Sequence, residues 1–336
     1  MSRLLLALAV CLLTMPSSSQ PVDAKRNQGL LLVANKGART VSIIDPESAK
    51  ELAVIPENGI TGHELAASPD GQRAFVPIYG NSGVGSPGTD GSNIVVIDIA
   101  SRKVVGNIDF GHGVRPHNAV FNPKDGMLYV TTELDQSISI IDPHRLKIVG
   151  AVPTGQPESH MLAITRDGRR GYTANVGPGT VSVLDLEQRK ATGVIRISDV
   201  TQRISLSVDD RMVFTSDQTK PQLAVIDTAT NNVKTWIPLP STGYGTAPTP
   251  DGRWLIVALP RISKVAVVDL ETMKVAHTVD VPRTPQEILV RPDGKIAYAS
   301  CDASRKVAAI RTSDWTVDKL IEAGAGADGL AWAAGH

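Results

Sequence analysis

Cysteine is nearly absent from this sequence, and its absence excludes a disulfide framework and clustered thiolate metal sites. Cys11 and Cys301 are the two cysteines in 336 residues. Cys11 lies in an N-terminal segment that we expect to be removed, so Cys301 would have no disulfide partner within the mature chain. A lone cysteine in an apolar segment is most often a small buried side chain, and we expect this of Cys301.

The sequence also lacks an excess of charge of one sign. Lys and Arg total 34, Asp and Glu also total 34, and no run of like charges occurs. A protein that binds nucleic acid or an anionic membrane surface usually carries a basic patch, so we expect neither partner here. There is no Gly-rich phosphate loop and no Gly-x-Ser-x-Gly nucleophile motif either.

Aromatic residues are scarce and make up 4% of the chain. Aromatic side chains usually contribute much of the buried area of a core, so Val, Ile, Leu and Ala must fill this one. The apolar residues alternate with polar ones at a period of two, which indicates strands, and we expect almost no helix.

The N-terminus has the pattern of a cleaved secretory signal. Arg3 precedes an apolar run at residues 4–15, and small polar residues follow it. The run is too short to cross a bilayer, so we expect no membrane span. We predict a signal peptide at residues 1–24, a single domain at residues 25–336, and a periplasmic or secreted protein.

One segment recurs along the chain and is the strongest signal in the sequence. Each copy is an alternating run, a Pro-Asp-Gly-like turn and a second alternating run, which predicts a β-hairpin because glycine accepts the positive φ of a tight turn. The copies span residues 62–76, 116–130, 159–173, 201–215, 243–257 and 285–299. An apolar strand such as TVSIID follows each copy and usually ends in Asp. We expect that Asp to hydrogen-bond the backbone of the next turn.

The spacing of these strand ends predicts the architecture. The end residues are separated by 53, 44, 43, 42, 42 and 42 positions, and they are Asp45, Asp98, Asp142, Asp185, Asp227, Asp269 and Arg311. A period in the low forties with four strands per repeat is typical of a β-propeller blade. The chain begins partway through a repeat and ends on a single strand at residues 326–332, which we expect beside residues 29–35. The prediction is an all-β, seven-bladed β-propeller whose C-terminal innermost strand joins three N-terminal strands.

The repeats also carry a family resemblance. The segments SPDG, TTELDQSISIID, TANVGPGTVSVLD and DTATNNVK resemble the YVTN-type family of bacterial secreted and surface propellers. The resemblance covers nearly all of the chain after the signal. It implies the seven-bladed fold but no single function, because this repeat occurs on propellers that bind, scaffold or catalyse.

One insertion interrupts the period. Residues 78–93, IYGNSGVGSPGTDGSN, lengthen the connection between the second and third strands of the first complete blade. The Gly, Ser and Pro content predicts a loop. Such a loop opens on the face where the innermost strands begin, so we expect it to overhang one mouth of the axial channel. A tolerated surface insertion without a role is the alternative.

Polar residues occupy one equivalent position in every blade, at the start of the innermost strand. These residues are His63, His117, His160, Gln202, Tyr244, Gln286 and Asp328. In a propeller this position rings the mouth of the axial channel, and neutral imidazoles on three consecutive blades suit zinc, copper or iron. His63, His117 and His160 are therefore candidate metal ligands. Polar residues that line a wet channel without any further role are the alternative.

Further polar residues flank the same strands and are candidates for catalysis and binding. We predict that Glu64, Tyr244 and His112 move protons. The candidate ligand-binding residues are Arg115, Asn118, Glu158, Gln202, Gln286 and Asp328. His144 falls in a turn and His277 in an outer strand, so we expect both at the surface, and we expect His336, the last residue, to be frayed.

Three classes of function fit these observations. The first is an envelope enzyme, a metal-dependent lyase or hydrolase that acts on a small molecule in the His-lined channel, a plan similar to that of the streptogramin-inactivating lyases. The second is a propeller that binds a ligand or partner without catalysis. The third is a redox propeller with copper or haem, although no Cys-x-x-Cys-His haem motif occurs. We expect a monomer with a small-molecule ligand.

Overall fold

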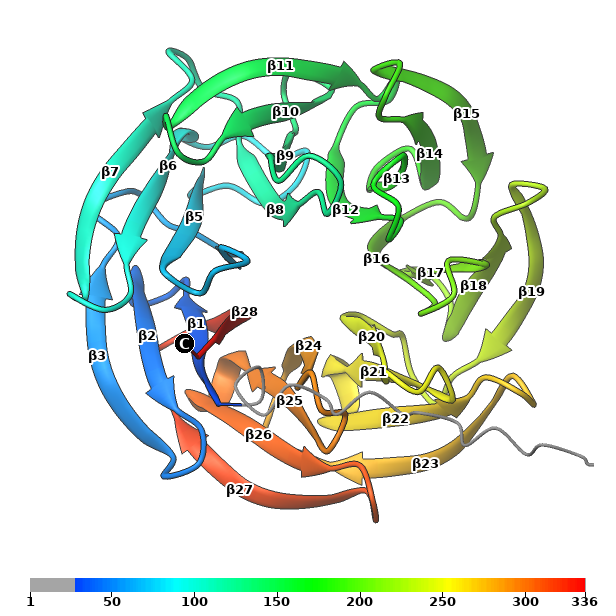
Figure 1. The fold of residues 1–336 in the computed structure, drawn as a ribbon. Coiled ribbons are helices and arrows are strands. Elements are labelled where there is room, and N and C mark those ends of the chain that lie inside the picture. Colours follow the sequence, from blue (N-terminus) through cyan, green and yellow to red (C-terminus); the bar gives the residue numbers. More distant parts are fainter. Residues whose placement is uncertain (1–27, 336) are drawn as a thin grey trace, which may run out of the picture.

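The computed structural model describes residues 28–335 and shows seven four-stranded antiparallel sheets arranged in a ring (Figure 1). The sheets are the blades of a propeller, and each has its innermost strand beside the central axis. Within the described residues, helix is limited to two 3-10 turns, η1 (Pro260–Ile262) and η2 (Asp302–Ser304). The predicted all-β, seven-bladed fold is confirmed. The predicted signal peptide and His336 lie outside the described residues.

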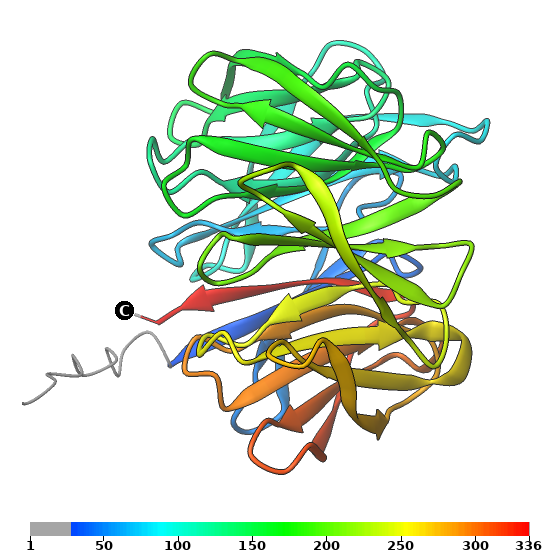
Figure 2. The same cartoon turned by 90° about the vertical axis from the view of Figure 1, so that its right-hand side faces the viewer.

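Blade 1 contains strands from both ends of the described chain. Its order from the axis outward is β28 (Ala327–Ala334), β1 (Gly29–Asn35), β2 (Thr40–Asp45) and β3 (Lys50–Pro56). The pairing of β28 with β1 is antiparallel, from Gly29 opposite Ala334 to Asn35 opposite Ala327. Figure 2 shows β28 in red beside β1 in blue. The last strand therefore takes the innermost place in the blade that the first three strands begin.

The other six blades each consist of four consecutive strands with the first strand innermost. Blade 2 contains β4 (Ala66–Ala67), β5 (Arg73–Gly80), β6 (Asp90–Asp98) and β7 (Lys103–Asp109). Blade 3 contains β8 (Pro116–Phe121), β9 (Leu128–Thr132), β10 (Ser137–Asp142) and β11 (Lys147–Pro153). Blade 4 contains β12 (Ser159–Ile164), β13 (Arg170–Asn175), β14 (Thr180–Asp185) and β15 (Lys190–Arg196).

The remaining three blades continue the same plan around the ring. Blade 5 contains β16 (Thr201–Leu206), β17 (Met212–Asp217), β18 (Gln222–Asp227) and β19 (Asn232–Pro238). Blade 6 contains β20 (Thr246–Pro248), β21 (Trp254–Leu259), β22 (Lys264–Asp269) and β23 (Lys274–Asp280). Blade 7 contains β24 (Pro285–Val290), β25 (Ile296–Cys301), β26 (Lys306–Arg311) and β27 (Thr316–Glu322).

The turns of the repeat have the conformations that the sequence predicts. One residue of each hairpin turn has a φ between 61° and 72°, and these residues are Gly71, Gly126, Gly168, Asp210, Gly252 and Gly294. The Asp at the end of the third strand accepts backbone N–H groups of the following turn, as Asp45 does from Glu47 and Asp98 from Ser101. The prediction that these aspartates form turns is confirmed.

The β5–β6 hairpin is longer than the sequence indicated. Ile78 pairs with Asn93 and Gly80 pairs with Asp90, so the loop is confined to residues 81–89. The prediction of a loop over residues 78–93 is therefore wrong at both ends. Glycine and serine there do not prevent pairing, because the two segments leave the sheet together and satisfy each other's backbone groups.

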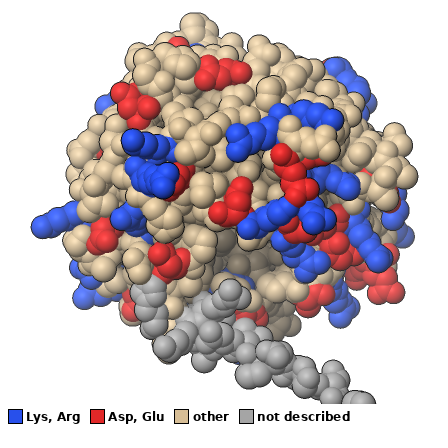
Figure 3. All heavy atoms as spheres, turned by 45° about the horizontal axis from the view of Figure 1, so that its top comes forward, with Lys and Arg blue, Asp and Glu red and all other residues tan. Residues whose placement is uncertain are grey.

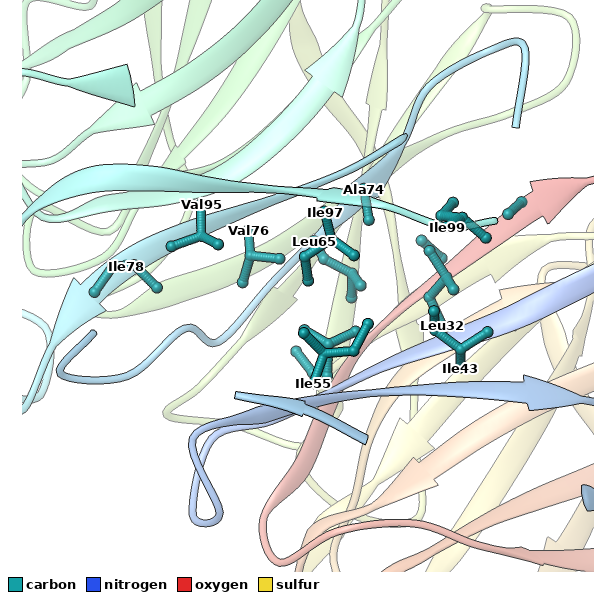
Figure 4. Packing of buried hydrophobic residues seen from close by; sticks show 14 residues of the cluster. Leu32, Ile43, Ile55, Leu65, Ala74, Val76, Ile78, Val95, Ile97 and Ile99 are labelled. Carbon is teal, nitrogen blue, oxygen red and sulfur yellow. The ribbon is translucent and has the colours of Figure 1, made fainter. Parts of the chain in front are cut away.

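The apolar cores lie between neighbouring blades. Figure 4 shows the cluster between blades 1 and 2, in which Leu32 and Ile43 of blade 1 pack with Val76 and Ile97 of blade 2. These four side chains are at most 1% exposed. Burying one such side chain contributes about 1.5–3 kcal/mol, so each blade depends on its neighbours for stability. Cys301 is buried in the cluster between blades 6 and 7, as predicted.

The outer surface carries charges of both signs. Figure 3 shows Lys and Arg side chains interspersed with Asp and Glu over one face. His144 and His277 are exposed, as predicted. In the part of the chain that the structure describes, none of the helices has the length and apolar character needed to cross a bilayer.

Candidate functional site

The starts of the innermost strands bring three histidine rings together in blades 2, 3 and 4. His63 precedes β4, and His117 and His160 are the second residues of β8 and β12. The rings of His117 and His160 are stacked, with centroids 3.6 Å apart and an interplanar angle of 30°. The ring of His63 meets that of His117 edge-on at 5.5 Å. The equivalent positions in the sequence therefore correspond to one cluster in space.

The stacked pair is buried and neutral. His117 and His160 are each 2% exposed. Burial lowers the pKa of both imidazoles well below the ordinary value, and the positive charge of Arg203 lowers it further. Burial also lowers the pKa of His63 to about 4. The Nδ1 atoms of His117 and His160 are buried without a hydrogen-bond partner, so each ring keeps unused bonding capacity.

The three rings do not converge on one point. Within residues 28–335, no group of three or more His, Cys, Asp or Glu side chains is arranged to hold a metal ion. Stacked imidazoles present their faces to each other, whereas a shared zinc ion requires ring nitrogens directed at it from about 2.0–2.1 Å. The three-histidine metal site that the sequence suggested is thus not found in this arrangement.

Tyr79 and Glu133, which the sequence analysis missed, border the histidine cluster. The Tyr79 ring lies 5.0, 5.2 and 5.9 Å from the ring centroids of His63, His117 and His160. Its hydroxyl donates a hydrogen bond to Glu133 Oε2 at 2.5 Å. Burial raises the pKa of the Tyr79 hydroxyl, and the bond to Glu133 raises it further. Tyr79 therefore remains a protonated donor that holds the carboxylate beside the cluster.

Arg203 bridges the centre of the ring from β16 and was also missed. Its Nη1 atom lies 2.5 Å from Glu64 Oε1 and 2.6 Å from Glu287 Oε2, and its Nη2 atom lies 3.4 Å from Asp328 Oδ1. These partners belong to blades 2, 7 and 1, and Figure 1 shows β16 and β28 on opposite sides of the ring. Arg203 is 2% exposed, so an ion-pair network occupies the axis at this level.

Carboxylates outnumber cations in this network. Glu64, Glu287 and Asp328 share the Arg203 guanidinium, and Lys36 adds a second cation 3.1 Å from Asp328. Burial raises the pKa of Glu64 and of Glu287 against the opposing effect of Arg203. Burial alone would lower the pKa of Lys36, but the neighbouring carboxylates raise it above its usual range. The predicted roles of Glu64 in proton transfer and of Asp328 in ligand binding stay predictions, with both groups engaged in ion pairs.

Tyr244 and Gln202 form a pair at the edge of the network. Gln202 Nε2 donates a hydrogen bond to the Tyr244 hydroxyl at 3.0 Å, and the Arg203 guanidinium carbon lies 4.6 Å from the Tyr244 ring centroid. Gln286 is half-buried, and its backbone oxygen accepts the N–H of Gly245. The catalytic role of Tyr244 and the binding roles of Gln202 and Gln286 stay predictions.

Arg115 anchors the insertion. Its Nε atom donates to Asp90 Oδ1 at 2.6 Å, Nη2 donates to the Ser86 carbonyl at 2.7 Å and Nη1 donates to Glu133 Oε1 at 3.2 Å. All three guanidinium nitrogens thus have protein partners. In this arrangement Arg115 holds the loop at residues 81–89, which leaves little capacity for the ligand-binding role predicted for it.

Asn118 and Glu158 also have backbone partners. Asn118 Oδ1 accepts the N–H of Leu162 at 3.0 Å and joins blades 3 and 4. Glu158 Oε2 accepts the N–H of Gly177 at 2.6 Å. The structure gives both side chains a positioning role in the scaffold, and their predicted ligand contacts stay predictions.

His112 is not brought into the buried cluster. Its side chain is 61% exposed, and Nε2 lies 2.9 Å from Asp135 Oδ1. That contact raises the pKa of the imidazole. The structure therefore places this predicted proton-transfer residue at the surface.

Two further positions of the repeat carry four of the residues that the sequence analysis missed. Arg203 and Glu287 stand one place after the polar position, and Glu133 stands directly after the second strand, as Lys36 does in blade 1. A comparison of these two positions across the blades would have found all four, because both positions open on the same end of the axis.

Glu57 lies at the entry to the loop that carries His63, and its burial should make the stability of the fold depend on pH. Glu57 Oε2 accepts the N–H of Gly62 at 2.7 Å, while Oε1 is buried without a partner. Burial raises the pKa of Glu57 to about 7. An unfolded glutamate ionises near a pKa of about 4.3. Between these values the folded state binds more protons, so stability falls as pH rises and Glu57→Gln should remove this loss.

Urea unfolding near pH 5 and near pH 8 measures this effect. We compare the unfolding free energy of Glu57→Gln with that of the wild type at each pH. From pH 5 to pH 8 this difference should change by on the order of 3 kcal/mol in favour of the variant. Glu271→Gln, at an exposed position, is the matched control and should show no such change. A pH-independent difference between Glu57→Gln and the wild type would contradict the prediction.

The part of the chain that holds the stacked histidines matches a known family. The family model described as "Cytochrome D1 heme domain" matches residues 88–293, which is more than half of the chain and includes His117, His160 and Arg203. The resemblance to YVTN-type propellers stays a resemblance of the repeats.

The relatives and solved structures are more distant. A 6-phosphogluconolactonase of Bacillus subtilis (strain 168) is 28% identical over 93 residues, which cover 25% of this chain and 27% of that protein. Hydrazine synthase of Kuenenia stuttgartiensis superposes with a TM-score of 0.72 at 19% identity over 86% of this chain and 94% of that chain. A functionally unknown protein from Desulfotomaculum acetoxidans DSM 771 has a TM-score of 0.74 at 13% identity, covering 91% and 99%. Structural matches at such identities show a shared fold alone.

Proposed function

Because the chain belongs to the cytochrome D1 haem domain family, we propose that it binds a haem at the histidine cluster and has a redox role. The observation that carries the proposal is the stacked pair of His117 and His160. Both are buried, neutral imidazoles within the matched region, and both have an Nδ1 atom without a partner. A neutral imidazole can bind a metal ion, and buried ring nitrogens without partners show that the polar groups of this cluster are not all satisfied within the protein.

The residues fit the donor requirement of a haem iron. A single neutral imidazole holds the iron in many haem proteins, so three converging ligands, as in a zinc site, would not be needed. His160 would bind through the ring nitrogen that does not face Glu133, with His117 stacked against it. Cys301 is buried in the core, so the haem would be held without covalent attachment. The bound group would supply a redox-active iron.

Of the three classes suggested by the sequence, the family match favours the redox propeller. The lyase or hydrolase with zinc or copper has no support in the family match, and His112, one of its predicted proton carriers, lies at the surface. The second class, a propeller that binds a ligand without catalysis, is compatible with this proposal if the ligand is haem. With the signal peptide predicted at residues 1–24, the proposal assigns this role to the periplasm or the exterior.

Titration of the purified protein with ferric haem tests the proposal. We expect a shifted Soret band that saturates at one haem per chain. His160→Ala should weaken binding by roughly 100-fold or more, since loss of an outer-shell partner alone costs about 10–100-fold. His117→Ala should weaken binding as well, because it removes the stacked ring.

Surface histidines provide the matched controls. His144→Ala and His277→Ala should bind haem as the wild type does, because both side chains are exposed. Circular dichroism and His160→Gln, which conserves volume better, guard against loss of folding. Absence of a saturable Soret shift in the wild type, or equal binding by all four alanine variants, would overturn the proposal.

A further inference from the structure

Glu133 lies between the histidine cluster and the insertion, and its two carboxylate oxygens face different neighbours. Oε2 accepts the Tyr79 hydroxyl at 2.5 Å and lies 3.9 Å from Nδ1 of His160. Oε1 accepts Arg115 Nη1 at 3.2 Å and the N–H of Gly85 at 3.3 Å. Glu133 is 3% exposed, so these contacts form in a desolvated setting.

The surroundings keep this carboxylate in place. Arg115 is committed to Asp90 and Ser86 as well as to Glu133, which anchors the oxygen on the insertion side. Tyr79 packs edge-on against the His160 ring at 5.9 Å, which anchors the other oxygen beside the imidazole. The carboxylate therefore has no freedom to turn away from the imidazole without breaking a buried hydrogen bond.

We propose that Glu133 is a positioning residue that orients the His160 imidazole for iron and couples it to the insertion at residues 81–89. The proposal rests on the haem-binding function proposed above. The carboxylate selects the tautomer with the proton on Nδ1, which leaves the lone pair on the opposite nitrogen of the ring. The same carboxylate holds Gly85, so the loop and the imidazole share one anchor.

The physical basis is the carboxylate–histidine pair. A histidine ligand usually donates its second ring N–H to a carboxylate or carbonyl, which fixes the ring and makes it a stronger donor to the metal. The present separation of 3.9 Å exceeds a hydrogen bond. Such contacts are often long in ligand-free proteins and shorten when the ligand binds. The unpartnered Nδ1 atom of His160 is accounted for by this arrangement.

Glu133→Gln is the informative substitution, and Glu187→Gln is its matched control. Glu187 lies on the same blade as His160, in the exposed turn between β14 and β15, where it forms an ion pair with Lys124. The two variants therefore make the same chemical change at one residue that faces His160 and at one that does not.

Three measurements separate the possible outcomes. In ligand-free protein with ¹⁵N-labelled histidine, Glu133→Gln should shift the tautomer population of His160, and proteolysis within residues 81–89 should accelerate. In haem-loaded protein, it should weaken haem affinity by about 10–100-fold and raise the midpoint potential of the iron, because the imidazole becomes a weaker donor. Glu187→Gln should leave the tautomer and the potential as in the wild type.

Failure of the haem-binding proposal and failure of the positioning role of Glu133 give different results. If the wild type binds no haem, the proposed function falls, while the tautomer and proteolysis of ligand-free protein still decide the role of Glu133. If haem binds and Glu133→Gln changes neither the tautomer of His160 nor the potential, the positioning role is wrong. A shift of the same size in Glu187→Gln would also overturn it, because the effect would then not depend on a carboxylate beside His160.

Discussion

Deleting residues 325–336 should abolish cooperative folding. The deletion removes β28, the innermost strand of blade 1, and leaves β1 with an unpaired edge facing the axis. Leu31, Leu32 and Val33 of β1 are fully buried, and the core side chains of β28 that cover this blade would be lost. An exposed, apolar edge strand also promotes aggregation. We expect no cooperative transition in thermal or urea unfolding, and largely insoluble expression.

A shorter truncation and a complementing peptide test whether the loss is due to β28. Removing only residues 335–336 leaves β28 intact and should preserve the melting temperature. A synthetic peptide of residues 325–335 added during refolding should restore part of the native signal, because the strand pairs through backbone and side chains already present in β1. If the truncated chain melts at the wild-type temperature, ring closure by β28 does not stabilise the fold.

Replacing Arg203 by Met should destabilise the fold by about 3–5 kcal/mol, the usual cost of removing one partner from a buried ion pair. The variant leaves Glu64, Glu287 and Asp328 facing one another with Lys36 as the remaining nearby cation. Arg253 stacks on an indole ring at the surface, so Arg253→Met is the control and should cost about 1 kcal/mol or less. Urea unfolding at neutral pH measures both.

The Arg203→Met variant should also respond to pH with a defined sign. Removing the guanidinium takes away the group that lowers the pKa of Glu64 and Glu287, so the pKa of each carboxyl in the folded state rises further above its unfolded value. The contribution of these two carboxyl groups to the unfolding free energy is then fully present below the unfolded pKa of about 4.3. That contribution is lost as pH rises through their pKa values in the folded state. The destabilisation should therefore shrink from pH 8 toward pH 5.

A combined variant separates charge from packing. Adding Glu64→Gln and Glu287→Gln to Arg203→Met should recover much of the lost stability, because neutral groups replace the uncompensated carboxylates. A pH-independent loss in Arg203→Met that the two glutamines fail to reduce would mean that the arginine stabilises the ring through packing alone.

Much of the fold can be read from the sequence because a propeller is a local repeat. The hairpins, the Asp-capped turns and the regular spacing of strand ends all involve residues close together in the chain, so their pattern survives without any knowledge of distant contacts. The same periodicity placed His117 and His160 in one equivalent position, and the structure stacks their rings. The length of the β5–β6 hairpin was misjudged, because Gly and Ser in a sequence do not reveal whether two segments pair.

The sequence by itself determined the seven-bladed ring and the histidine cluster at the start of its innermost strands. Only the tertiary structure decided that Arg203 bridges the axis to Glu64 and Glu287, and that Glu133 faces His160. These contacts join blades through side chains from strands that are not hydrogen-bonded to each other. The repeat shows that such residues occupy equivalent positions, but it does not show which of them meet across the axis. The raised pKa values of Glu64 and Glu287 follow from burial at the axis, and burial is a property of the closed ring that no single repeat possesses.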